Sequence, residues 1–209
     1  MEKLLTVEDA KTRLFAGLAD ITGWKLQKSR SQLNAQTNDL VFQLDVHFSK
    51  YNRSEESICA DLDFCFWNRG YGKTGDVNSI VGNLSYRNGE NSWFDISTEE
   101  KLGSVLRQLE PQLRDTAVNL YTRFETDYDA AMKKLVDEDL IKYRIWLRFI
   151  EDKLGREAVE QAARTLCEQA AEPMKRQLTE FAATGKIGGW LRMDRNAKYM
   201  AEHGLIRLP

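Results

Sequence analysis

Residues 39–67 read DLVFQLDVHFSKYNRSEESICADLDFCFW, and two runs within this stretch alternate apolar and polar side chains almost without interruption. Because successive side chains of a β-strand point to opposite faces of a sheet, the alternation predicts two strands that each bury one face. The polar face of these strands carries four ionisable side chains: Asp45, His47, Asp61 and Asp63. What that face does is the first question that the sequence raises.

The two strands are predicted to pair as an antiparallel hairpin through the connection YNRSEE at 51–56. One register matches apolar residues across the pair and sets the following partners opposite each other: Phe48 and Ala60, Val46 and Leu62, Leu44 and Phe64, Phe42 and Phe66. In the same register His47 lies opposite Asp61. Asp45 then faces Asp63, and such a pair of like charges costs a fraction of a kcal/mol, roughly 0.2–1.

The flanking segments add a helix and further strands. A helix is predicted to begin after Thr6, a capping residue, and to end at Gly23. Additional strands are predicted over 24–28, 32–35, 77–87 and 93–96. The pair Asn88-Gly89 predicts a tight hairpin turn between the last two. We therefore predict an α+β fold, an antiparallel sheet of about five strands with helices packed on one face.

From Ser97, which heads a capping motif, the chain is predicted to be helical to its end. The first of these helices is expected to be interrupted at Pro111. A further helix over 139–154 is apolar on more than one side, which is typical of a helix packed between two layers. We predict two parts: an α+β sheet domain over 1–136 and a helical C-terminal extension over 137–209 that packs on it.

The composition is typical of a soluble globular protein: 209 residues, 42% of them hydrophobic, and a formal net charge of −2. Without a basic excess, we expect no general nucleic-acid binding. No apolar run approaches the roughly 18 residues of a membrane span, and none resembles a signal peptide. The three cysteines lack the spacing of a zinc site. We expect reduced thiols in a cytoplasmic protein that has no membrane partner.

The order of several motifs carries a resemblance to a known family. A helix ending in GWKL (23–26) is followed by a polar strand pair, then by LVFQLDVHFSKYN (40–52), ICADLDFCFW (58–67) and a helix-rich end. In this layout residues 1–135 resemble the uncharacterised bacterial domain-of-unknown-function 4304 family. The resemblance implies an α+β fold and supplies no reaction, cofactor or catalytic residue. The chain after about residue 137 lies outside it.

The acidic face allows three interpretations. The simplest is a solvated sheet face without a ligand. Alternatively, its carboxylates recognise a basic protein partner. In a third interpretation a divalent metal ion relieves the repulsion between them, since hard cations prefer carboxylate oxygens. The metal ligands would then be Asp45, His47, Asp61 and Asp63.

The glycine-rich segment NRGYGKTGD (68–76) provides a second candidate surface. Its GYGKT portion is similar to the end of a phosphate-binding loop, but Trp67 stands where that motif requires glycine, and a strand-like run follows instead of a helix. We therefore expect no nucleotide binding. The aromatic and basic residues of this loop are suited to contact a partner: Trp67, Arg69, Tyr71 and Lys73.

No catalytic set is evident, because the two histidines, His47 and His203, are far apart in sequence and lie in no nucleophile signature. We predict a non-catalytic bacterial cytoplasmic binding protein of the immunity or inhibitor kind, without a cofactor. Its acidic face and aromatic loop would bind a protein partner, such as a basic toxin domain. Two alternatives stay open: a metal-dependent hydrolase using the acidic face, and a homodimeric scaffold formed by the C-terminal helices.

Overall fold

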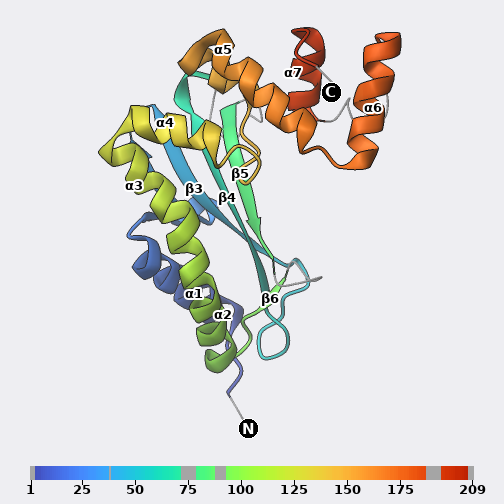
Figure 1. Cartoon of the computed structure of the whole chain (residues 1–209). Helices are drawn as coiled ribbons and strands as arrows, with labels where there is room; N and C mark the ends of the chain where they lie inside the picture. The colour runs from blue at the N-terminus through green and yellow to red at the C-terminus, as the bar shows by residue number, and fades with distance from the viewer. Residues whose placement is uncertain (1–2, 38, 72–78, 88–92, 187–193, 207–209) are drawn as a thin grey trace. The chain divides into compact units, whose positions relative to one another are not determined.

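The computed structural model describes residues 3–37, 39–71, 79–87, 93–186 and 194–206 (Figure 1). The chain divides into two compact units, Met1–Ala131 and Met132–Pro209. This boundary lies inside helix α4 (Tyr128–Asp137), a few residues before the division expected after residue 136. The predicted turn at Asn88-Gly89 lies outside the described residues.

An antiparallel sheet forms the centre of the first unit and confirms the predicted α+β fold. Its strands are, in spatial order, β1 (Lys25–Gln27), β2 (Gln32–Thr37), β3 (Leu40–Phe48), β4 (Cys59–Asn68) and β5 (Ile80–Tyr86). A sixth strand, β6 (Phe94–Asp95), was expected to form a hairpin with β5 but pairs with β4. The reason is that β5 reaches only Leu62 of β4, which leaves Ala60 free to pair with Phe94.

The register of β3 and β4 is the one predicted from the alternation. Asp45 lies opposite Asp63, and His47 lies opposite Asp61. The apolar partners fall on the other face, here called the inner face, and five of their side chains have no exposed surface: Phe42, Leu44, Leu62, Phe64 and Phe66. Because one face is fully buried, a slip of one residue would expose all of these side chains at once.

Three helices cover the inner face, as Figure 1 shows for one side of the sheet: α1 (Val7–Thr22), α2 (Glu99–Leu113) and α3 (Asn119–Thr126). Thr6 caps α1 by accepting a hydrogen bond from the Asp9 backbone, and Gly23 ends the helix at a φ of 70°. Aromatic contacts join helices and sheet. The ring of Phe42 lies 5.9 Å from that of Phe124 in α3.

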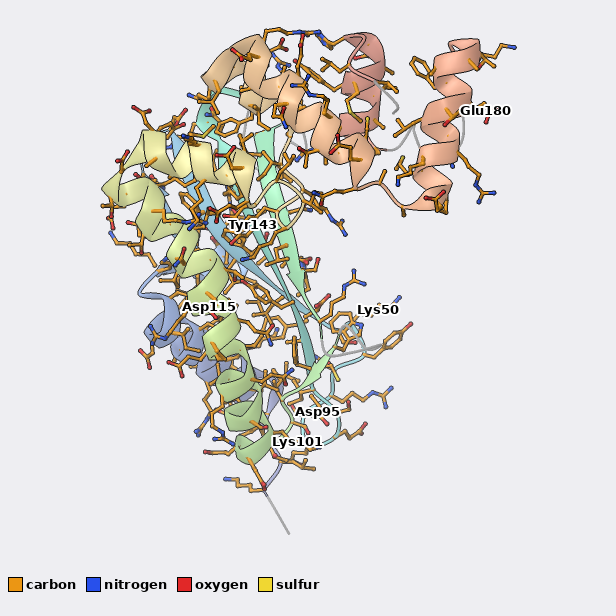
Figure 2. All side chains as sticks on the ribbon, viewed as in Figure 1. Lys50, Asp95, Lys101, Asp115, Tyr143 and Glu180 are labelled. Atoms are coloured by element: carbon orange, nitrogen blue, oxygen red, sulfur yellow. The ribbon has the colours of Figure 1, made fainter. Side chains whose placement is uncertain are left out.

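Two details at the start of α2 differ from expectation. The helix is capped by Thr98, whose hydroxyl accepts from the Lys101 N–H at 3.3 Å, and not by Ser97. The Ser97 hydroxyl instead donates to Asp95 at 2.7 Å. Lys101 Nζ reaches the other oxygen of the same carboxylate at 2.8 Å (Figure 2).

Pro111 does not interrupt the helix as expected. It lies within α2, and the chain continues through a π-helical turn, η4 (Arg114–Val118), directly into α3. The Tyr86 hydroxyl of β5 lies 2.5 Å from the Thr116 hydroxyl in this turn. A proline removes one helical hydrogen bond, and the wider π turn adjusts the helix after it.

The second unit contains α5 (Leu147–Glu168), α6 (Glu172–Thr184) and α7 (Arg195–Glu202). The helix predicted over 139–154 is wrong in its first half, because α5 begins only at Leu147. The preceding turns bury Tyr143 and Ile145 completely. Asn196 of α7 holds this junction: its Nδ2 donates to the Ile145 carbonyl at 2.7 Å, and its Oδ1 accepts from the Leu147 N–H at 3.0 Å.

None of the helices within the described ranges is long and apolar enough to cross a membrane.

The two faces of β4 should respond very differently to truncation. We expect Leu62→Ala to lower the free energy of unfolding by about 2–5 kcal/mol, because it opens a cavity under a fully buried side chain. Asp63→Ala, one residue further along the strand, should change it by less than about 1 kcal/mol, because Asp63 makes only a partly exposed ion pair. Urea denaturation measures both free energies of unfolding. Equal losses of stability would contradict the assignment of Leu62 and Asp63 to opposite faces of the strand.

Candidate functional site

The face of the sheet opposite the helices, here called the outer face, collects the polar side chains of five strands. By register its residues are Lys25 and Gln27 of β1, Gln32, Asn34 and Gln36 of β2, Gln43, Asp45 and His47 of β3, Cys59, Asp61, Asp63, Cys65 and Trp67 of β4, and Asn83 and Ser85 of β5. They form two regions with different chemistry, an acidic patch and an amide-lined groove.

The acidic patch consists of the four predicted residues Asp45, His47, Asp61 and Asp63. The His47 Nε2 lies 3.4 Å from Asp63 Oδ2, and both side chains are about half exposed. Asp45 accepts from Gln43 Nε2 at 2.9 Å through each of its oxygens. Asp61 accepts from the Leu62 backbone N–H at 2.9 Å. Among the described residues, His47 therefore pairs with Asp63, and Arg87 adds a second positive charge near Asp61.

The patch shifts the titration of its members. Partial burial and the nearby Asp63 charge raise the pKa of Asp61, opposed by the Leu62 N–H, His47 and Arg87. Burial, with the Asp45 carboxylate beside it, raises the pKa of the Cys65 thiol to about 12. The thiol hydrogen bonds to Asp45 Oδ2 at 3.8 Å. Since the thiolate is the reactive form, Cys65 is unsuited to act as a nucleophile near neutral pH.

A metal ion would need several side chains that converge on one point. Over the part of the chain that the structure describes, no three His, Cys, Asp or Glu residues are arranged to hold one. The geometry of Asp45, His47, Asp61 and Asp63 therefore gives the metal-dependent alternative no support.

The aromatic loop predicted beside the acidic patch lies further along the sheet. Trp67 is on the outer face four residues after Asp63, which corresponds to about 13 Å along a strand. Arg69 and Tyr71 form the short turn η2 (Arg69–Tyr71), and Arg69 Nη2 donates to Gln36 Oε1 at 2.7 Å. Lys73 lies outside the described residues. The structure thus groups Trp67 and Arg69 with the amide side chains of β2.

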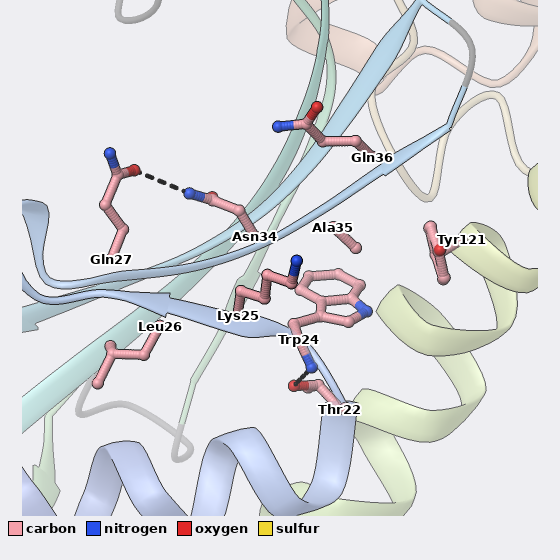
Figure 3. A pocket seen from close by; sticks show the side chains of 10 residues that line it. Thr22, Trp24, Lys25, Leu26, Gln27, Asn34, Ala35, Gln36 and Tyr121 are labelled. Atoms are coloured by element: carbon pink, nitrogen blue, oxygen red, sulfur yellow. Dashed lines mark hydrogen bonds between the residues drawn. The ribbon is translucent and has the colours of Figure 1, made fainter.

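The amide groove comprises two adjoining cavities that share Gln27, Asn34 and Gln36. The first, here called the edge pocket, has a volume of about 620 Å³ and includes Trp24, Lys25 and Tyr121 in its lining (Figure 3). The second, the face pocket, has a volume of about 360 Å³, and its lining includes Arg30, Val41, Trp67 and Arg69. Within the described residues, no aspartate or glutamate lines either cavity.

Sequence reasoning identified the acidic patch but missed the groove. A usable signal exists, because Gln32, Asn34 and Gln36 occupy alternate positions and so share one face of a strand. The pattern does not show that β1 lies beside them or that α3 brings Tyr121 to the same place. Both facts depend on contacts between segments that are distant in sequence.

Comparison of the chain with protein-family models, with curated proteins and with solved structures found no match. The resemblance of residues 1–135 to the domain-of-unknown-function 4304 family therefore stays a prediction. Any functional conclusion depends on the geometry of the outer face.

The raised pKa of Asp61 predicts a pH-dependent effect of Asp61→Asn. A carboxyl whose folded pKa lies above its unfolded value of 3.8 favours folding when protonated, and that contribution is lost as the pH rises through the folded pKa. The neutral amide avoids this loss and keeps the oxygen that accepts from Leu62. We expect the variant to be more stable than the wild type at pH 7, with a difference that shrinks toward pH 3. Denaturation at both pH values measures it, and a constant difference would contradict the assignment.

Proposed function

We propose that this chain is a non-catalytic binding protein that docks a basic protein partner on the acidic patch of its outer face. The observation that carries the proposal is the direct opposition of Asp45 and Asp63 on neighbouring strands, with Asp61 beside them. The His47 and Asp63 side chains are about half exposed, so this charge is accessible to a partner.

The energetics favour a partner that supplies positive charge. Carboxylates directly opposite each other on paired strands destabilise a sheet slightly. Lysine or arginine side chains of a partner would turn this repulsion into attraction. Complementary charge also steers the encounter and raises the association rate. A rigid strand pair is a good support for such a surface, because its side chains are held more firmly than those of a loop.

The chemistry of the patch is consistent with binding rather than catalysis. Cys65, the thiol closest to Asp45, is buried and its pKa is raised well above neutral pH. We further propose that the protein belongs to the immunity or inhibitor kind and works in the bacterial cytoplasm. An inhibitor of a basic toxin domain needs a stable, charged docking surface and no reactive group of its own.

Charge reversal tests this function. We expect the chain to copurify with the product of the gene next to its own. The triple variant Asp45→Lys, Asp61→Lys, Asp63→Lys should lower the association rate constant at least about tenfold, because it replaces attraction by repulsion. Surface plasmon resonance at two salt concentrations measures the rate and its ionic-strength dependence.

A matched control carries the same change of charge elsewhere. Glu157, Glu168 and Glu180 are exposed on α5 and α6, so their replacement by lysine should leave the association rate within about twofold of the wild type. If the variant with lysine in place of the three aspartates bound as fast as the wild type, the acidic patch would be removed from the proposal. Failure of the wild-type chain to bind the neighbouring product would contradict an inhibitor of that product.

A further inference from the structure

The edge pocket exists because β1 is shorter than its neighbour. Strand β1 begins at Lys25, opposite Asn34, while β2 continues to Thr37. Before Lys25 the chain turns away into α1 at Gly23, whose φ is 70°. The end of β2 therefore has no β1 partner on this side, and a cavity of about 620 Å³ lies there, with Tyr121 of α3 also in its lining (Figure 3).

A buried donor without a partner lies in the lining of this pocket. The Trp24 side chain is 5% exposed, and its Nε1 has no hydrogen-bond partner. Its backbone N–H is satisfied by the Thr22 hydroxyl at 3.1 Å, so only the indole N–H is left over. Figure 3 shows the nitrogen-bearing edge of the indole directed toward Tyr121. Buried donors are nearly always paired, so an orphaned one suggests a missing ligand.

The charge of the pocket shows what kind of ligand would fit. Lys25 is exposed and has no ion-pair or hydrogen-bond partner among the described residues. The other polar side chains of the described lining are neutral: the amides of Gln27, Asn34 and Gln36 and the hydroxyls of Thr22 and Tyr121. Asn34 Nδ2 donates to Gln27 Oε1 at 3.0 Å, and Asn34 Oδ1 has no partner. Lys25 is the charged side chain that the described lining contributes, and the nearby Glu125 carboxylate is occupied by the Tyr121 hydroxyl, so the pocket favours a negatively charged group. Arg30 and Arg69 extend the same charge into the adjoining face pocket.

The aromatic residues supply an apolar wall. The Trp24 and Tyr121 rings lie 6.1 Å apart in an edge-to-face arrangement. The Tyr121 hydroxyl donates to Glu125 Oε1 at 2.7 Å, so the polar end of the tyrosine is already occupied. What Tyr121 offers to a ligand is therefore its ring.

We propose that the edge pocket binds a small organic anion with a flat apolar body. Lys25 and the Trp24 indole N–H bind the oxygens of a carboxylate or phosphate group, and the apolar body lies against the Tyr121 ring. The pocket has the volume of ordinary small-molecule sites, about 300–1,000 Å³. Because the indole nitrogen is closed to solvent, the ligand shifts the Tyr121 ring slightly as it enters. The site is separate from the acidic patch, so it does not depend on the function proposed above.

An NMR titration with three probes tests the site. Benzoate and phenyl phosphate present the two anionic groups on the same ring, and benzylamine is their cationic counterpart. We expect a saturable shift of the Trp24 indole resonance, assigned from the Trp24→Phe spectrum, with one or both anions and none with benzylamine. The anion that binds more tightly identifies the preferred group. An unchanged resonance with both anions, or an equal response to benzylamine, would overturn the proposal.

Three variants separate the site from general electrostatic attraction. Lys25→Gln should raise the Kd of the tighter anion about tenfold or more, because it removes a charge-assisted hydrogen bond. Trp24→Phe should raise it about threefold to tenfold while keeping an aromatic ring in place. Lys28→Gln removes the same charge from a neighbouring residue that does not line the pocket, and should change the Kd less than twofold.

The pattern of these results decides the outcome. If Lys28→Gln weakens binding as much as Lys25→Gln, the anions respond only to local positive charge and the site is refuted. If Trp24→Phe binds as the wild type does, the indole N–H has no ligand role and simply faces the Tyr121 ring. Should Trp24→Phe fail to fold, the comparison of the two exposed lysines still decides whether the pocket binds the anion.

Discussion

The period-two alternation of β3 and β4 is the constraint on which the rest of the structure depends. It sends Leu44 and Phe64 to a fully buried face, where a shift of one residue would instead place Asp45 and Asp63. Burying carboxylates without partners costs far more than any strand pair gains, so one register prevails. The helices then cover the apolar face, and the polar groups of several strands gather on the other.

The outer face that results is divided by charge. Asp45 and its acidic neighbours lie toward one end, whereas Arg30 and Arg69 line the face pocket. Gln43 joins the two regions, because it donates to both oxygens of Asp45 and also lines that pocket. Arg30 precedes Gln32, which pairs with Asp45, whereas Arg69 follows the far end of β4. A macromolecule that covered the whole face would therefore meet both signs of charge. A ligand confined to one region would need only one sign.

The sequence predicted what short-range patterns determine: the strands, their register and the acidic patch. It failed where neighbouring residues compete for one role and where distant contacts decide. Ser97 and Thr98 are both capping residues, and the local hydrogen bond from Ser97 to Asp95 leaves the cap to Thr98. The apolar run before Leu147 reads as helix, but it is buried as irregular turns. The edge pocket was missed because it depends on where β1 ends relative to β2, which neither strand shows alone.

Asn196 bonds the residues just before and at the start of α5, and this pair of hydrogen bonds is here called the clamp. The clamp affects the order in which the chain can acquire its structure during synthesis. Asn196 follows Leu147 by 49 positions, so both hydrogen bonds of the clamp must wait until Asn196 has left the ribosome. All strands of the sheet, by contrast, are complete once Asp95 has been translated. The nascent protein therefore has a period in which its N-terminal half can be native while the helical half still lacks its closing contact, and this interval is when chaperones would find the latter exposed.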